Sequence, residues 1–168
     1  KPIDITAIVT VADDGGSSGR LRHELQMPPP GDIRNVLAAL SETEPLFEEL
    51  LQYRFPNGNG LSGHSLGNLL LAALTNITGD FAKGVRELSR VLNVRGKVLP
   101  AANQSIMLSA VMVDGTIVDG ESNIPRHGDK IAKVYLTPAD VEPLQESIDA
   151  LREADLIIIG PGSLYTSI

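Results

Sequence analysis

The feature that most constrains this chain is an apolar run that stops at a polar turn. Residues 5–12 read Ile-Thr-Ala-Ile-Val-Thr-Val-Ala, and Asp13 and Asp14 follow directly. Such a run suits a strand that is covered on both faces, as in a parallel sheet. Ligands of open α/β sheets bind just beyond the carboxyl ends of strands, where adjacent carboxylates can hold a metal or a ribose. The run therefore predicts a strand end that carries a ligand site.

The turn after the two aspartates is rich in glycine and serine, with Gly15, Gly16 and Ser17 in succession. Glycines let backbone N–H groups approach phosphate oxygens, and Arg20 offers a fork of hydrogen-bond donors. Asp, Gly and Ser are also the usual residues of solvated turns. From the residues alone, a ligand site and a plain turn are equal alternatives.

Hydrophobic periodicity predicts one α/β domain in which helices cover a mainly parallel sheet. Helices are expected over residues 33–40, 44–53, 66–74, 81–92 and 139–153, and strands over 5–12, 106–112, 116–118, 131–136 and 155–159. Asp32 and Asp80 are expected to cap the helices that follow them. Asp114 and Gly115 signal a hairpin, so residues 104–136 are predicted to form a β insertion or an antiparallel edge.

Composition narrows the function classes. The 168 residues carry a formal net charge of −7, which argues against a general nucleic-acid binder. The chain has no cysteine for a disulfide or a thiolate metal site, and no apolar run of membrane-spanning length. We therefore expect a cytoplasmic protein without membrane insertion. Because Lys1 is not an initiator methionine and residues 160–168 read as a strand-to-helix turn, we also expect a fragment of a longer protein.

A second candidate segment runs from Gly31 to Asn35, directly after three prolines. Asp32 has a structural interpretation as a helix cap. Arg34 and Asn35 follow in the first turn, however, and a cation at a helix N-terminus opposes the macrodipole. An anionic ligand at this position would remove the conflict, so the segment is predicted to contribute to binding.

Residues 63–67 fit G-x-S-x-G, the nucleophile elbow of α/β hydrolases, and Asp119 or Glu121 followed by His127 would give the triad order of that fold. An elbow serine directly follows a buried strand, whereas residues 56–62 read as a polar loop. The favoured interpretation is that Ser62 or Ser65 caps the next helix. His64 and Asn68 would then lie on one helix face, where they need core hydrogen bonds or a ligand.

The turn Gly160-Pro161-Gly162-Ser163 follows the last predicted strand, so its N–H groups and the serine hydroxyl could cradle a phosphate. Neighbouring parallel strands would place this turn at the same sheet edge as the paired aspartates. No G-x-G-x-x-G or Walker A pattern is present, and the three histidines show no metal-ligand spacing.

Five stretches taken together are more specific than any one of them. They are VADDGGSSGRLR (11–22), PPPGDIRN (28–35), GNGLSGHSLGN (58–68), NVRGKVLP (93–100) and IGPGSLYTSI (159–168). In these stretches the chain resembles the bacterial gluconeogenesis factor family (YvcK-like), within a wider group that includes 2-phospho-L-lactate transferase (CofD-like). The G-G-G-T-G-x-S loop with which that family begins is absent here, as is the family's C-terminal half.

The resemblance implies a Rossmann-like three-layer αβα fold, with a mainly parallel sheet and a small β-hairpin insertion, that binds a nucleotide or nucleotide sugar at the strand ends. A uridine-diphosphate amino sugar is the expected ligand of a regulatory protein that supports cell shape and envelope synthesis on gluconeogenic carbon. The alternative is a Mg²⁺-dependent phospho-group transferase, in which Asp13 and Asp14 would hold the metal and serve catalysis. Mg²⁺ is the one candidate cofactor, needed only in this alternative, and a homo-oligomer is left open.

The full set of candidate ligand residues follows from the segments above. It comprises Asp13, Asp14, Gly15, Gly16, Ser17, Arg20, Gly31, Asp32, Arg34, Asn35, His64, Ser65, Asn68, Gly160, Pro161, Gly162 and Ser163.

Overall fold

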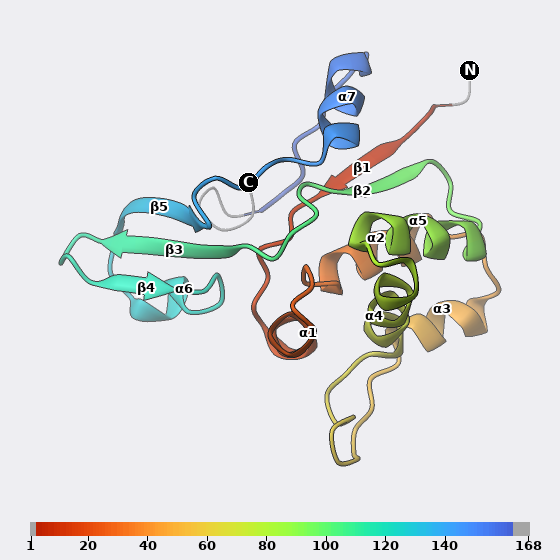
Figure 1. Ribbon diagram of the computed structural model, residues 1–168, viewed down its shortest axis with the longest axis horizontal. Helices are drawn as coiled ribbons and strands as arrows, with labels where there is room; N and C mark the ends of the chain where they lie inside the picture. The colour runs from red at the N-terminus through yellow and green to blue at the C-terminus, as the bar shows by residue number, and fades with distance from the viewer. Residues whose placement is uncertain (1–2, 163–168) are drawn as a thin grey trace.

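The computed structural model of the chain describes residues 3–162 (Figure 1). Its helices are α1 (Gly16–Leu25), α2 (Gly31–Leu40), α3 (Pro45–Gln52), α4 (Leu66–Thr78), α5 (Phe81–Val91), α6 (Ile124–His127) and α7 (Gln145–Glu153). Its strands are β1 (Thr6–Val9), β2 (Lys97–Pro100), β3 (Met107–Met112), β4 (Ile117–Asp119) and β5 (Ile131–Thr137). The chain is thus an α/β protein, as the sequence predicts.

A parallel pair of strands, β1 and β2, lies at the centre of the larger part of the fold. Thr6 pairs with Lys97, and the register continues to Val9 and Pro100. In Figure 1, α2, α4 and α5 lie below this pair and α7 lies above it. The main core joins α2, α4 and α5 to the parallel pair through fully buried side chains, among them Val11, Ile33, Leu37, Leu71, Val85 and Leu92.

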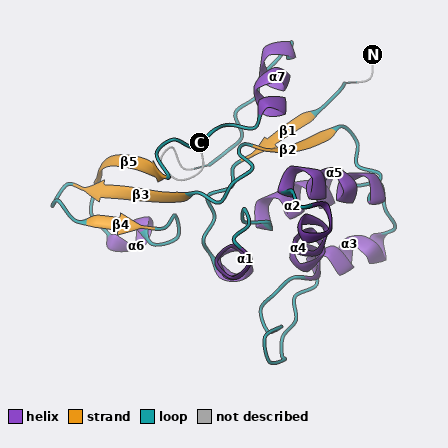
Figure 2. Ribbon diagram, in the orientation of Figure 1, coloured by secondary structure: helices purple, strands orange, loops and turns teal. Residues whose placement is uncertain are grey.

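A second, antiparallel sheet has the strand order β4-β3-β5 and stands apart from the parallel pair (Figure 2). Alternate residues of β3 point to one face, where Leu108, Ala110 and Met112 pack against Ile124 of α6. The hairpin predicted at Asp114 joins β3 to β4, with the amide of Thr116 donating to Asp114 Oδ1 at 2.8 Å.

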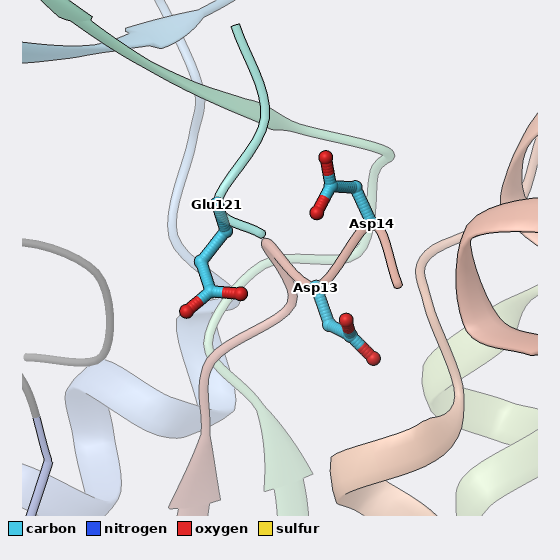
Figure 3. A group of neighbouring side chains, drawn as sticks. All are labelled: Asp13, Asp14 and Glu121. Atoms are coloured by element: carbon cyan, nitrogen blue, oxygen red, sulfur yellow. The ribbon is translucent and has the colours of Figure 1, made fainter. Parts of the chain in front are cut away.

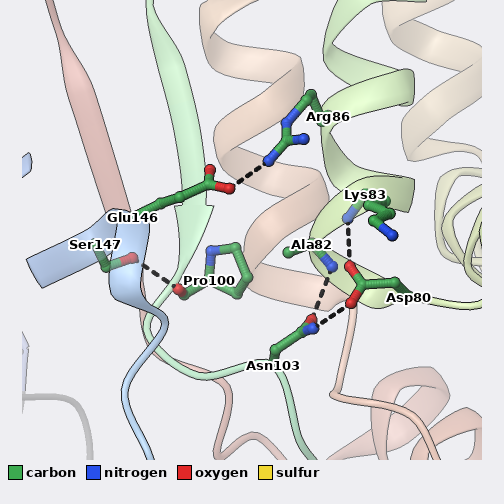
Figure 4. Close-up of polar contacts among 8 residues, drawn as sticks. All are labelled: Asp80, Ala82, Lys83, Arg86, Pro100, Asn103, Glu146 and Ser147. Carbon is green, nitrogen blue, oxygen red and sulfur yellow. Dashed lines mark hydrogen bonds and ion pairs between the residues drawn. The ribbon is translucent and has the colours of Figure 1, made fainter. Parts of the chain in front are cut away.

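The predicted helices α4 and α5 are confirmed together with their caps. The Ser65 side chain accepts a hydrogen bond from the amide of Asn68 at the start of α4, and Asp80 Oδ1 accepts one from Lys83 at the start of α5. Asn103, in the loop after β2, adds a second cap (Figure 4). Its amide Nδ2 donates to Asp80 Oδ2 at 2.6 Å, and its Oδ1 accepts from the amide of Ala82 at 2.8 Å. The α5 N-terminus is therefore held to the end of the parallel pair.

Three local predictions are corrected. Asp32 is not a cap: α2 begins one residue earlier, at Gly31, with Pro30 before it and no side-chain capping bond. Residues 139–144 precede α7 instead of forming its first turns, because Pro143 disfavours the helical conformation of the residue before it. Residues 155–159 do not form a buried strand: Leu156 and Ile158 are 76% and 80% exposed. A strand needs a hydrogen-bonded neighbour, and among residues 3–162 the only neighbour of β1 is β2.

Within the described part of the chain, no helix combines the length and the apolar character that crossing a membrane requires.

Candidate functional site

Three carboxylates from distant parts of the sequence meet beyond the end of β1. They belong to Asp13 and Asp14, which follow the strand, and to Glu121, in the turn between β4 and α6 (Figure 3). One carboxylate oxygen from each residue lies within 4.8 Å of the other two, and all three residues are half-buried. We call this group the carboxylate edge. Oxygen ligands of this kind suit Mg²⁺, and they also accept hydrogen bonds from sugar hydroxyls.

The backbone around Asp13 fixes its position. Its Oδ1 accepts a hydrogen bond from the amide of Gly15 at 2.8 Å. On its other side lies Gly31, the first residue of α2, where a Cβ atom would be 3.3 Å from Asp13 Oδ2 and would collide with Ser18 Oγ. Glycine at position 31 thus lets the start of α2 approach both the aspartate and α1.

The turn between β4 and α6 holds Asp14. The Asp14 Oδ1 atom accepts a hydrogen bond from the amide of Ser122 at 2.9 Å. Its Oδ2 atom lies against Gly120, so that a Cβ atom at that position would collide with it. The antiparallel sheet therefore contributes directly to the carboxylate edge.

Asp32 adds a fourth acidic group close by. Loss of solvent around its carboxyl and the neighbouring charge of Asp13 raise the pKa of Asp32 above its usual value, while Arg34 partly opposes the shift. A cluster of like charges that raises a carboxyl pKa favours binding of a proton or another cation. The convergence of three carboxylates, with Asp32 beside Asp13, makes the edge a place that attracts positive charge and hydroxyl donors.

A second group of polar side chains is buried between α1 and α4. Ser17 Oγ lies 2.9 Å from His64 Nδ1 and accepts a hydrogen bond from Asn68 Nδ2 at 3.1 Å. We call these three residues the buried junction. Because the serine oxygen already accepts from Asn68, its own hydrogen can be donated to His64 Nδ1, which leaves the imidazole proton on Nε2. His64 precedes the cap Ser65, so it does not share a face of α4 with Asn68 as predicted, but both side chains have the expected core hydrogen bonds. Asn68 Oδ1 is one of two buried side-chain atoms in residues 3–162 without a partner.

The electrostatic surroundings of His64 keep it neutral. Burial lowers the pKa of His64 below its ordinary value, Arg20 and Arg54 lower it further, and Glu24 opposes them. Arg20 itself is exposed, and its Nη2 donates to the carbonyl of Ser62 at 2.7 Å. The exposed guanidinium therefore lies on the solvent side of the junction.

Arg34 contacts the interior of the protein. It is 6% exposed, and its guanidinium donates to the carbonyl of Leu51 at 3.5 Å, to Gln52 Oε1 and to Asn35 Oδ1. Burial lowers the pKa of Arg34, and Arg54 lowers it too, against the effect of Asp32. These contacts give Arg34 and Asn35 a structural role in joining α2 to α3.

The nucleophile-elbow interpretation of Ser65 is wrong. The serine is fully buried and caps α4, and its neighbour His64 bonds to Ser17. Within the described residues, His127 is the only histidine within ion-pair distance of a carboxylate, and that carboxylate belongs to Asp114, at 4.0 Å. No catalytic triad forms at Ser65.

The last predicted turn is exposed and open at Gly160. Gly160, Pro161 and Gly162 are exposed, and a Cβ atom at Gly160 would meet nothing within 4 Å. Ser163 lies outside the described residues. The structure thus brings Asp13, Asp14 and Gly31 together, while the placement of the Gly160 turn at the same edge stays a prediction.

Sequence reasoning missed Glu121 and Gly120 as parts of the carboxylate edge. A signal was present, because residues 118–123 read Val-Asp-Gly-Glu-Ser-Asn and repeat the acidic, glycine and serine pattern that follows β1. Both segments follow a strand. A search for similar strand ends would have paired the two turns.

Two hollows border these elements. A small cavity of about 280 Å³ includes Asp14 and Gly19 in its lining. A larger open groove of about 900 Å³ lies between α5, β2 and α7, away from the carboxylate edge, and is lined by charges of both signs. We take the carboxylate edge as the candidate site because three carboxylates converge there. In the groove, by contrast, Arg86 and Glu146 neutralise each other in an ion pair (Figure 4).

Comparison with known proteins gives a consistent result. The model of the family described as 2-phospho-L-lactate transferase CofD matches residues 1–168. A Bacillus subtilis protein named gluconeogenesis factor is 72% identical over 100% of this chain and 53% of its own length. Its namesake from Halalkalibacterium halodurans is 71% identical over 99% of this chain and 52% of its own length. The chain thus spans about half the length of the curated relatives it matches.

A solved structure supports the fold. The crystal structure of a Bacillus halodurans member of the upf0052 family superposes with a TM-score of 0.96 and 71% identity. The match covers 99% of this chain and 54% of that one. The resemblance to the gluconeogenesis factors that the sequence indicated is confirmed.

Proposed function

Because the family model covers its whole length, this chain belongs to the 2-phospho-L-lactate transferase CofD family, and we propose that it binds a uridine-diphosphate amino sugar at the carboxylate edge. The protein then acts as a cytoplasmic regulator, a gluconeogenesis factor that supports cell shape and envelope synthesis on gluconeogenic carbon. The relatives that carry the name gluconeogenesis factor support the link to gluconeogenesis.

The convergence of Asp13, Asp14 and Glu121 beyond β1 is the observation that carries the proposal. Ionised carboxylates accept strong hydrogen bonds from ribose and sugar hydroxyls. The start of α2 at Gly31, which lies beside Asp13, offers positive potential for a diphosphate. A ligand with hydroxyls at one end and phosphates beside them matches this arrangement.

Titration calorimetry on the protein at the full length of its relatives tests the proposal. Uridine-, guanosine- and adenosine-diphosphate sugars are compared, each with Mg²⁺ and with EDTA. We expect the uridine amino sugar to bind under both conditions. Asp14→Asn should weaken binding about tenfold or more, because a hydrogen bond to a charged group is lost. Asp4→Asn, at an exposed position, is the matched control. A preference for guanosine donors, or no binding by any of the sugars, would contradict the proposal.

A second candidate function, a Mg²⁺-dependent phospho-group transferase, is favoured by Glu121. The sequence near Asp13 and Asp14 offers no third acidic ligand, and Glu121 supplies one from the antiparallel sheet. These three residues would hold the ion, which would neutralise charge developing on the transferred group. The same titration separates the two functions: binding that requires Mg²⁺, together with a phospho-transfer product, selects the transferase.

A further inference from the structure

Asp13 and Asp14 are adjacent in sequence but are held by different parts of the fold. Asp13 bonds to the amide of Gly15, two residues away. Asp14 bonds to the amide of Ser122, which is 108 residues away. The orientation of the second carboxylate therefore depends on the antiparallel sheet, whereas the orientation of the first does not.

The turn that holds Asp14 is itself well fixed. The carbonyl of Gly120 accepts hydrogen bonds from the amides of Asn123 at 3.1 Å and Ile124 at 3.2 Å, and its amide donates to the carbonyl of Leu108 at 2.9 Å. Asn123 Nδ2 donates to the carbonyl of Asp119 at 3.0 Å. Ile124 is 1% exposed and belongs to the small core of the antiparallel sheet. The turn cannot move away from Asp14 without disrupting this core.

Glycine at position 120 is required for two separate reasons. Its φ angle is +94°, a conformation that side chains disfavour, and a Cβ atom would collide with Asp14 Oδ2. Gly115, in the β3–β4 hairpin of the same sheet, has a similar φ angle of +87° but nothing within 4 Å of its Cβ position. Replacement of either glycine by alanine thus strains the backbone, and only replacement of Gly120 displaces the carboxylate.

We propose that Gly120 is a positioning residue for Asp14, so that the antiparallel sheet sets the geometry of the ligand site. Asp14 faces Asp13 and Glu121 because Gly120 leaves room for its carboxylate and Ser122 donates to it. The part of the inference that concerns ligand affinity rests on the proposed function. It also predicts a structural change that can be observed without any ligand.

The experiment compares Gly120→Ala with Gly115→Ala in the protein at the full length of its relatives. The first readout is the amide proton of Ser122 in NMR spectra, which a carboxylate acceptor shifts downfield. We expect it to move upfield in Gly120→Ala and to stay in place in Gly115→Ala. The second readout is the affinity for a uridine-diphosphate amino sugar. Gly120→Ala should lose about tenfold or more, because misplacement of a binding group is costly, and Gly115→Ala should change it less than about twofold.

A double-mutant cycle distinguishes positioning from general destabilisation. If Gly120 acts through Asp14, combining Gly120→Ala with Asp14→Asn should weaken binding no more than Asp14→Asn does alone. Additive losses would overturn the inference, as would an unchanged Ser122 amide in Gly120→Ala.

If the unmodified protein does not bind the sugar, the proposed function fails, and the Ser122 amide still decides the positioning role. If Gly120→Ala does not fold, Ser122→Pro removes the donor N–H instead, and an unchanged affinity would then count against the inference.

Discussion

The chain contains two apolar runs that end in glycine-rich turns, and within residues 3–162 only the first of them pairs with another strand. Residues 6–9 pair with β2, and the turn that follows contacts α2, α4 and the antiparallel sheet. Residues 155–159 pair with no described strand, and Gly160 meets nothing at its Cβ position. The two segments have similar composition. The difference shows that a strand end becomes a site through the neighbours that surround it.

Replacing Gly19, in the first turn of α1, and Gly160, in the last glycine-rich turn, should give the largest contrast. A Cβ atom at Gly19 would collide with the backbone carbonyl of Asp14, whereas one at Gly160 lies in open space. We expect Gly19→Ala to lower the free energy of unfolding by at least about 3 kcal/mol, since the backbone must shift. Gly160→Ala should change it by less than about 0.5 kcal/mol. Urea denaturation followed by circular dichroism measures both, and equal effects would show that the first turn is as loosely held as the last.

A smaller effect is expected from removing one hydroxyl that anchors the first turn. Ser17→Ala leaves Asn68 Nδ2 and His64 Nδ1 buried without their partner. The expected loss is about 1–3 kcal/mol in the free energy of unfolding, the cost of unpaired buried polar groups. Ser62→Ala removes an exposed hydroxyl that bonds to the carbonyl of Pro56 and should cost less than about 0.5 kcal/mol. If both variants lose the same stability, the buried junction does not anchor α1.

The smallest effect concerns pH. Burial, Arg20 and Arg54 lower the pKa of His64, so the unfolded chain binds this proton more readily than the folded protein does. Stability should therefore fall as the pH drops below about 6.5, the ordinary histidine value, and continue to fall until the folded protein also takes up the proton. His64→Asn should reduce this dependence, whereas His23→Asn, at an exposed position, should not. Urea titrations between about pH 5 and pH 7.5 measure the free energy of unfolding at each pH. If it depends on pH equally in the unmodified protein, His64→Asn and His23→Asn, then His64 is not the group responsible.

Local signals in the sequence were sufficient for α4 and α5. Their apolar spacing and the caps Ser65 and Asp80 act within one helical turn, so no distant contact is needed to predict them. The four-residue strand β2 was not predicted, because its pattern is short and ends in Pro100. The composition of residues 155–159 favours a strand, but a strand also needs a hydrogen-bonded neighbour, and these residues have none among the described strands.

The candidate site likewise combines residues that local sequence predicts with residues that distant contacts bring in. Asp13 and Asp14 are evident from the turn that follows an apolar run. Glu121 joins them through the placement of a second sheet, which no periodicity encodes. The roles of Arg34 and His64 depend on burial, and both side chains face partners that the sequence does not place near them.

The hydrogen bond between Asp14 and Ser122 has a consequence for the order of folding. It closes a loop of 108 residues, and contacts of such long range form late, because the entropy of loop closure must first be offset by other interactions. During synthesis, the two aspartates leave the ribosome long before the residues that orient them. We expect the nascent chain to present an incomplete site, and ligand recognition to begin only once the antiparallel sheet has docked.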